Sequence, residues 1–82
     1  MIAKSSSSLL SLLIAEDEAL AKEELYGEMI VEYREMAEAT DNQILRSEYA
    51  EEIAKYASLR DDAINEVLST RDMIRNYLLG RK

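Results

Sequence analysis

Apolar side chains recur along most of the chain at alternating steps of three and four residues. This spacing places them on one side of an α-helix that packs against another helix. Two such stripes are present, and a polar break separates them. The first stripe consists of Leu12, Ala15, Ala19, Lys22, Tyr26, Met29, Tyr33 and Met36. The second stripe consists of Tyr49, Ile53, Tyr56, Arg60, Ala63, Val67, Thr70, Ile74 and Tyr77. The pattern predicts an all-α protein with two long helices.

The polar break covers residues 39–43. Thr40 is followed three residues later by Gln43, which is the spacing of a capping box at the start of a helix. Gly80 follows the last apolar residues of the second stripe and suits a helix C-terminus. We therefore expect one helical-hairpin domain over residues 1–82. Its segments are a flexible N-terminus (1–7), a first helix (8–39), a turn (40–43), a second helix (44–79) and a tail (80–82).

The two stripes agree about the register of the hairpin. If the chain folds back at residue 41, residues whose numbers sum to 82 lie side by side. This rule brings together the pairs Tyr26–Tyr56, Met29–Ile53, Tyr33–Tyr49, Ala19–Ala63 and Ala15–Val67. Four tyrosines then face one another near the turn, and we interpret them as an aromatic core. A radical or metal-proximal tyrosine site is the alternative.

Each helix also has a second lane of apolar residues beside its stripe, which one partner helix cannot cover. The lanes are Leu9, Leu13, Leu20, Ile30 and Ala37 on the first helix and Ala50, Ala57, Ile64, Leu68 and Leu78 on the second. Two hairpins that dimerise into a four-helix bundle would cover both lanes. We expect a homodimer, or an obligate complex with another protein. The residues predicted to make these contacts are Leu9, Leu10, Leu13, Ile14, Leu20, Ile64, Leu68 and Leu78.

Each stripe contains one cation, Lys22 in the first and Arg60 in the second, and the register places both at the same level. Together with neighbouring acids they are candidates for a buried polar layer that fixes register and partner number. The alternative is that both side chains extend to the surface along their aliphatic stems.

Composition restricts the chemistry. The 82 residues include no Cys and no His, so thiol nucleophiles, thiolate metal sites and histidine-dependent triads are excluded. We expect no catalysis and no cofactor. Lys4, four serines and the apolar residues that follow resemble a signal peptide in outline; these are Leu9, Leu10, Leu12, Leu13, Ile14 and Ala15. The apolar run is short, however, and Leu13 stands where a small residue should precede cleavage after Ala15. We therefore expect a cytoplasmic protein without a membrane partner.

Charge is unevenly distributed. The net charge is −7, but residues 16–52 contain thirteen acidic and three basic residues, a local charge of −10. Direct nucleic-acid binding is not expected of such a chain. Five acids follow one another at steps of three or four on the first helix: Glu24, Glu28, Glu32, Glu35 and Glu38. Because such like charges repel within their own helix, we predict that they bind a basic partner. A solvated face that only maintains solubility is the alternative.

Residues 51–61, which read EEIAKYASLRD, resemble the second helix of a ferritin-like half-bundle of the rubrerythrin and encapsulated-ferritin type. The likeness extends over residues 23–67. It implies paired hairpins in a four-helix bundle, which in that family holds a di-iron centre through a Glu and a Glu-x-x-His motif. Here Ile53 and Tyr56 stand where the Glu and His belong, which argues against ferroxidase activity. A site built only from carboxylates, drawn from Glu23, Glu48, Glu51 and Glu52, is the remaining metal hypothesis.

The sequence therefore favours a non-catalytic, acidic, self-associating protein-interaction module. Its sharpest version is a DNA-mimicking inhibitor of a nucleic-acid enzyme, of the kind that phages and mobile elements carry. The alternatives are a degenerate ferritin-like metal or redox protein, and a virion or scaffold component whose function is assembly. The partner's identity does not follow from the sequence.

Overall fold

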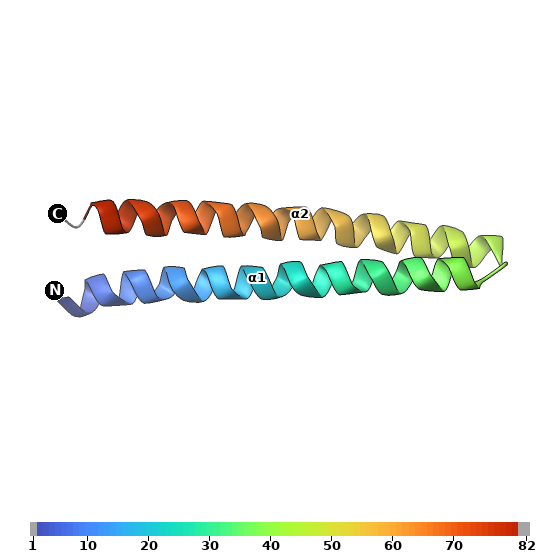
Figure 1. Ribbon diagram of the computed structural model, residues 1–82, viewed down its shortest axis with the longest axis horizontal. Helices are drawn as coiled ribbons and strands as arrows, with labels where there is room; N and C mark the ends of the chain where they lie inside the picture. Colours follow the sequence, from blue (N-terminus) through green and yellow to red (C-terminus); the bar gives the residue numbers. More distant parts are fainter. Residues whose placement is uncertain (1, 81–82) are drawn as a thin grey trace.

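The computed structural model is a hairpin of two antiparallel α-helices (Figure 1). It describes residues 2–80, with side chains from Ser8 onward. α1 spans Ile2–Ala39 and α2 spans Gln43–Leu79, and the described residues contain no strand. The predicted helical hairpin is confirmed. α1 begins at Ile2, before the start predicted at residue 8. The flexibility expected of residues 1–7 stays a prediction, and residues 81–82 of the predicted tail lie outside the described residues.

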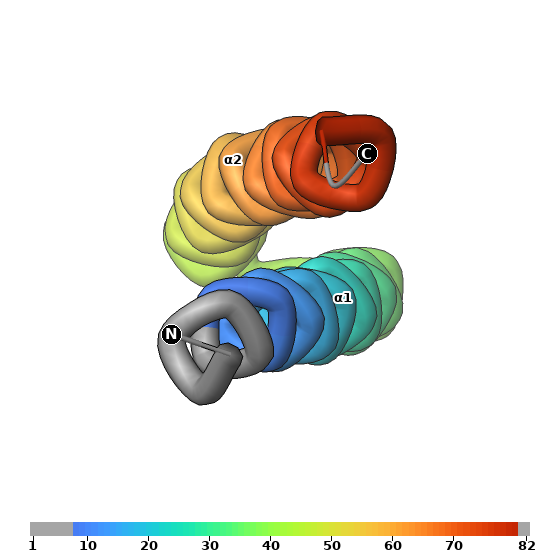
Figure 2. The backbone as a smooth tube through the Cα atoms, turned by 90° about the vertical axis from the view of Figure 1, so that its left-hand side faces the viewer, coloured from blue at the N-terminus to red at the C-terminus, as the bar shows by residue number. Residues whose placement is uncertain are grey.

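The hairpin is long and thin. Its principal extents are 61 × 16 × 13 Å, and its radius of gyration is 18.4 Å. A compact chain of this length would have a radius of gyration of about 12 Å. Viewed from the end that carries both termini, the helices coil about each other along their length (Figure 2). Each helix therefore has one neighbour, and most of its circumference faces solvent.

Residues 40–42 form the turn, and local hydrogen bonds hold it. The Oδ1 of Asn42 accepts from the backbone N–H groups of Ile44 and Leu45 at 2.9 and 3.2 Å. Asn42 is thus the N-cap of α2, and the capping box predicted for Thr40 and Gln43 is wrong. Thr40 has another part in the turn: its Oγ1 accepts from the N–H of Asn42, and its carbonyl accepts from Nε of Arg46 at 2.8 Å. A capping box at Thr40 would start the helix at residue 41, whereas α2 starts two residues later, at Gln43, and has Asn42 as its N-cap.

The tyrosines confirm the register predicted near the turn. The ring centroids of Tyr26 and Tyr56 lie 5.9 Å apart, and those of Tyr33 and Tyr49 lie 6.0 Å apart. Tyr33 also stacks on Tyr56, with an interplanar angle of 16°. All four residues are half-buried. The four rings therefore form one continuous aromatic cluster between α1 and α2 in the half of the hairpin nearer the turn.

Next to the tyrosines, near the middle of the hairpin, the most deeply buried side chains are small. Ala19 and Ala63 are 1% and 2% exposed, and Val67 and Thr70 of α2 are also buried. Small side chains at these buried positions leave little space between the two helices. Ile30 is the remaining buried apolar residue among those that the structure describes, and no large side chain among them is fully buried. Four buried apolar residues make a small core for two helices of this length.

α1 is rotated about its axis relative to the sequence prediction. Leu12, Ala19, Tyr26 and Tyr33 face α2 as predicted, but Ala15, Lys22 and Met36 are exposed. The residues that face α2 between Leu12, Ala19, Tyr26 and Tyr33 are instead each one position later in the sequence than predicted. They are Glu16, Glu23, Ile30 and Ala37, and all four are buried or half-buried. The predicted contact between Ala15 and Val67 is therefore wrong. In α2, by contrast, every residue of the predicted stripe except Arg60 is buried or half-buried.

In the rotated arrangement a glutamate of α1 lies against α2. The Oε2 of Glu16 accepts a hydrogen bond from Nε of Arg71 at 2.7 Å, and its side chain is 23% exposed. The aliphatic part of Glu16 can therefore pack against α2 while its carboxylate meets a cation at the edge. The pattern of apolar residues predicts Ala15 at the contact with α2, because such a pattern does not take ion pairs between the helices into account.

Candidate interaction surfaces

Large apolar side chains are exposed over the whole length of the hairpin. Twelve are at least 36% exposed: Leu10, Leu13, Ile14, Leu20, Leu25, Val31, Met36, Ile44, Leu68, Met73, Leu78 and Leu79. Six of the eight residues predicted to contact a partner are in this set, namely Leu10, Leu13, Ile14, Leu20, Leu68 and Leu78. The other two, Leu9 and Ile64, are half-buried within the hairpin. Singly exposed apolar residues are ordinary, but rows of them indicate a contact surface.

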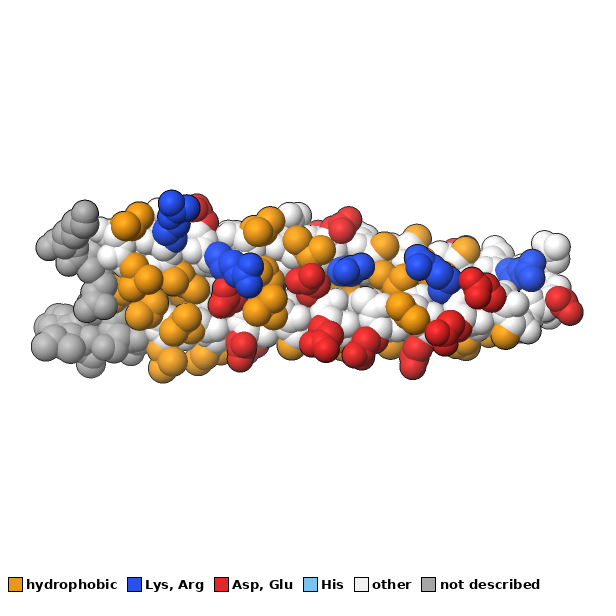
Figure 3. Space-filling view, in the orientation of Figure 1, with side chains coloured by type: hydrophobic (Ala, Val, Ile, Leu, Met, Phe, Trp, Pro, Cys, Tyr) orange, Lys and Arg blue, Asp and Glu red, His pale blue; other side chains and the backbone are white. Residues whose placement is uncertain are grey.

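Much of this apolar surface follows one side of the hairpin. On α1, Leu10, Leu13, Leu20 and Val31 belong to a lane of three- and four-residue steps that also contains Asp17, Glu24 and Gly27. On α2, a matching lane contains Ile64, Leu68 and Leu78 together with Arg71 and Arg75. We call these two lanes the groove face. Along the side viewed in Figure 3, hydrophobic side chains gather between the helices toward the termini, and acidic side chains follow the α1 edge.

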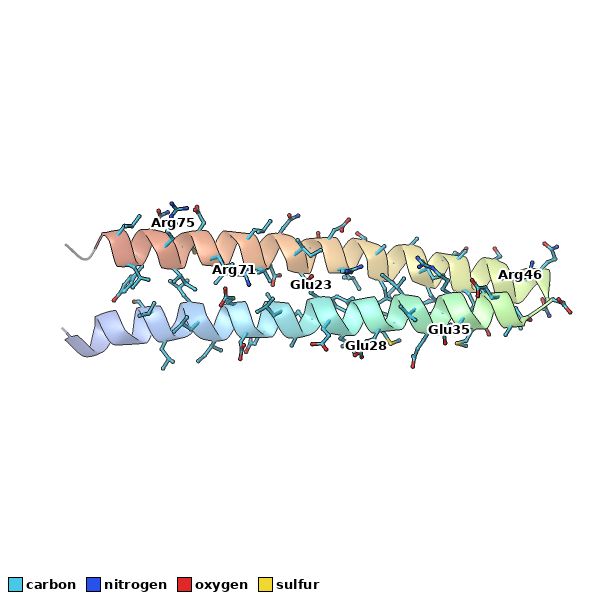
Figure 4. All side chains as sticks on the ribbon, in the orientation of Figure 1. Glu23, Glu28, Glu35, Arg46, Arg71 and Arg75 are labelled. Carbon is cyan, nitrogen blue, oxygen red and sulfur yellow. The ribbon has the colours of Figure 1, made fainter. Side chains whose placement is uncertain are left out.

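An open groove lies on this face near the middle of the hairpin. It is lined from α1 by Leu20, Glu23, Glu24, Gly27, Glu28, Val31 and Glu32, and from α2 by Arg60. The guanidinium of Arg60 lies across Gly27: a Cβ on that glycine would be 3.8 Å from Nε of Arg60. The groove thus combines apolar walls, four carboxylates and one cation. Figure 4 labels Glu23 and Glu28 on α1 together with Arg71 and Arg75 on α2.

The predicted acidic stripe lies on the outer surface of α1. Glu24, Glu28, Glu32, Glu35 and Glu38 are all exposed. None of the five makes an ion pair with a side chain that the structure describes, whereas Glu16, Glu52 and Glu66 do. Glu24, Glu28 and Glu32 border the groove, and Glu35 and Glu38 continue from it toward the turn. The stripe is therefore available to a cationic partner.

Lys22 and Arg60 do not form the predicted buried polar layer within the hairpin. The side chain of Lys22 is 52% exposed, and its Nζ lies 4.0 Å from a carboxylate oxygen of Glu66. Arg60 is exposed on the groove face beside Gly27. Because α1 is rotated, Lys22 projects from the opposite flank, which we call the Lys22 flank. The two cations extend to the surface on different sides, which was the alternative interpretation.

Other kinds of site have little support in the geometry. No group of three Asp or Glu side chains within the described part of the chain converges closely enough to hold a metal ion. Glu23 and Glu52 are half-buried, while Glu48 and Glu51 are exposed. Neither described helix contains a segment of the length and apolarity needed to cross a membrane.

Sequence reasoning missed two residues of the groove, Gly27 and Val31. Both lie in the α1 lane of the groove face, at three- and four-residue steps from Leu20 and Glu24. The spacing was therefore readable from the sequence. It was overlooked because two carboxylates and a glycine interrupt the apolar residues of that lane.

Comparisons with protein-family models, with curated proteins and with solved structures found no match to this chain. The resemblance to ferritin-like half-bundles stays a prediction, and the function has to be argued from the surfaces of the hairpin itself.

Proposed function

We propose that this protein is a non-catalytic interaction module: a self-associating helical hairpin whose acidic α1 surface binds a basic macromolecular partner. The observation that carries the proposal is the excess of exposed surface. The hairpin exposes 6288 Å², whereas a compact protein of its mass exposes about 5000 Å². The difference exceeds the roughly 800 Å² that each partner buries in a typical stable complex.

The kind of surface supports the same function. Twelve large apolar residues are exposed, against four buried apolar residues in the described part of the chain. Exposed apolar side chains do not stabilise an isolated hairpin. They become buried when another chain packs against it, so an excess of exposed over buried apolar residues favours a module that binds other chains.

The acidic surface supports a basic partner. Its five glutamates make no ion pair with a side chain that the structure describes, although Arg60 lines the same groove as three of them. Repulsion between successive members costs a few tenths of a kcal/mol per pair. The strongest form of the proposal is a DNA mimic, in which these carboxylates occupy a groove that otherwise holds phosphates. In that form the protein inhibits a nucleic-acid enzyme.

Charge reversal tests the proposal. The variant carries Glu32→Lys, Glu35→Lys and Glu38→Lys. The control carries Glu48→Lys, Asp62→Lys and Asp72→Lys, which change the net charge equally at other exposed positions. We expect the unchanged chain and the control to capture the same basic protein at low salt, and the variant to lose it. For the DNA-mimic form, purified chain should displace DNA from the captured protein. Equal capture by the variant and the control would refute the role of the acidic surface.

A further inference from the structure

The groove face has the chemistry of a self-complementary contact. Its α1 lane combines Leu10, Leu13, Leu20 and Val31 with the acids Asp17 and Glu24. Its α2 lane combines Ile64, Leu68 and Leu78 with the bases Arg71 and Arg75, and Arg60 borders the groove beside it. One lane is thus apolar and acidic, and the other is apolar and basic. Such a surface is complementary to a second copy of itself when the α1 lane of each copy packs against the α2 lane of the other.

We propose that two copies of this chain pack groove face to groove face with their turns at the same end, so that α1 of each copy lies on α2 of the other. The arrangement rests on the self-association in the proposed function and specifies its geometry. It has a two-fold axis parallel to the long axis of the hairpin, and the product is a four-helix bundle.

Residue levels within the hairpin show which groups would meet. The ion pairs Glu16–Arg71 and Lys22–Glu66 join residues of α1 and α2 whose numbers sum to 87 or 88. The tyrosine contacts nearer the turn join residues whose numbers sum to 82 or 89. Side chains that reach one another between the helices in the half toward the termini therefore have numbers that sum to about 87. A two-fold axis along the hairpin preserves these levels between copies. Leu10 then lies opposite Leu78 of the partner subunit, and Leu20 lies opposite Leu68 of the partner subunit. Apolar residues therefore meet apolar residues at both levels.

The charged positions match in the same way. Asp17 is level with Arg71 of the partner subunit, because Arg71 bonds to the neighbouring Glu16 within its own chain. Glu24 and Glu28 are level with the partner's Arg60, because Arg60 lies beside Gly27 within its own chain. Opposite charges across a contact favour the correct pairing and steer the encounter of the two copies. Arg60 would then act between the subunits, although it forms no layer inside the hairpin.

The other face-to-face arrangement, with the turns at opposite ends, is less complementary, although Leu10 again meets an apolar residue, Val31 of the partner subunit. It places α1 of one copy on α1 of the other in antiparallel orientation, with Leu20 near the centre of both. Asp17 then lies opposite Glu24 of the partner subunit, and Leu13 lies opposite the partner's Glu28. Like charges meet, and an exposed leucine packs against a carboxylate. Such pairs disfavour the opposite-end arrangement.

Distance measurement between spin labels distinguishes the two arrangements. The chain has no cysteine, so a single cysteine introduced at the exposed residue Asp41 reports one distance per dimer. The same-end arrangement predicts a distance below about 30 Å, because packed helices lie 8–10 Å apart and the rest is label length. The opposite-end arrangement predicts a distance near the 61 Å length of the hairpin. A label at Ser58, near the middle of α2, gives a short distance in both arrangements and serves as the control for dimer formation.

A pair of matched substitutions tests the face. Leu68 lies on the groove face and is 58% exposed, while Met73 is 50% exposed and lies seven residues from Glu66 on the Lys22 flank. We expect Leu68→Glu to raise the dimer dissociation constant by about a hundredfold, because a two-fold axis buries the new carboxylate twice. Met73→Glu should leave the dissociation constant within about threefold, which is the scatter expected of a surface substitution. Both should retain the helical circular dichroism of the unchanged chain.

The outcomes separate this inference from the proposed function. A dimer with a long distance at residue 41, or a dimer that Met73→Glu disrupts and Leu68→Glu does not, would refute the same-end contact and leave self-association intact. A chain that sediments as a monomer at millimolar concentration would refute self-association itself. A short distance at residue 41 together with the selective effect of Leu68→Glu supports the inference.

Discussion

Single polar residues determine how the two helices meet. Glu16 occupies a position that faces α2, and it remains there because Arg71 reaches it at 2.7 Å. The energetic value of this pair is modest, since Arg71 is 56% exposed and solvent screens the interaction. Its structural consequence is larger, because it accompanies the rotation of α1 that brings Ile30 inward and leaves Lys22 outside.

Asn42 determines where α2 begins. Its side chain accepts the N–H groups of Ile44 and Leu45, which would otherwise lack partners in the first turn of the helix. We predict that Asn42→Ala lowers the free energy of unfolding by about 1 kcal/mol, measured by urea unfolding at one fixed chain concentration. Asp41→Ala changes the adjacent exposed residue and serves as the control. Equal losses in the two variants would mean that the cap contributes nothing.

At the scale of the helices, spacing is controlled by small residues. Ala19 of α1 and Ala63 of α2 are the two least exposed apolar residues in the described part of the chain. Neither position has room for a longer side chain unless the helices separate.

Ala63→Leu should therefore destabilise the hairpin. We expect a loss of about 1–3 kcal/mol, the usual range for overpacking a filled contact, read from urea unfolding. Ala21→Leu adds the same atoms at an exposed position of α1 and should change the stability by less than about 0.5 kcal/mol. If Ala63→Leu were as stable as the unchanged chain, the close approach of the helices at this level would be disproved.

The helices themselves were predictable, and the rotation of one of them was not. Two stripes and one polar break specify two helices, an antiparallel turn near residue 41 and the contacts of Tyr26 with Tyr56 and of Tyr33 with Tyr49. These follow from periodicity, which depends on local sequence. The choice between Ala15 and Glu16 depends on a cation 55 residues away, and no local pattern contains that information.

The sequence predicted most of the residues that lie on the candidate surfaces, but it did not predict how these residues are arranged around the groove. The acidic stripe and six of the eight apolar contact residues are exposed as expected. The groove was not predicted, because two carboxylates and a glycine interrupt the apolar residues of its α1 lane.

The molecule as a whole has two unlike regions of surface. The groove face is apolar with matched charges at its edges, and the outer surface of α1 is acidic. A dimer that uses the groove face covers six of the twelve exposed apolar residues, namely Leu10, Leu13, Leu20, Val31, Leu68 and Leu78. Glu24 and Glu28 lie at the edge of this contact, and Glu35 and Glu38 continue outside the groove toward the turn. Self-association and partner binding are therefore compatible, and the dimer would present two acidic surfaces to a partner.

Dimerisation predicts that thermal stability depends on concentration. For a folded dimer that unfolds to separate chains, a tenfold rise in concentration adds about 1.4 kcal/mol to the free energy of unfolding. For a bundle of this size the midpoint of thermal unfolding should rise by roughly 3–6 °C, followed by circular dichroism at 10, 100 and 1000 µM chain. Met73→Glu should keep the same dependence, because it lies outside the groove face. A midpoint that does not move over this range, in reversible scans, would mean that the hairpin unfolds as an independent monomer and that its exposed leucines have another purpose.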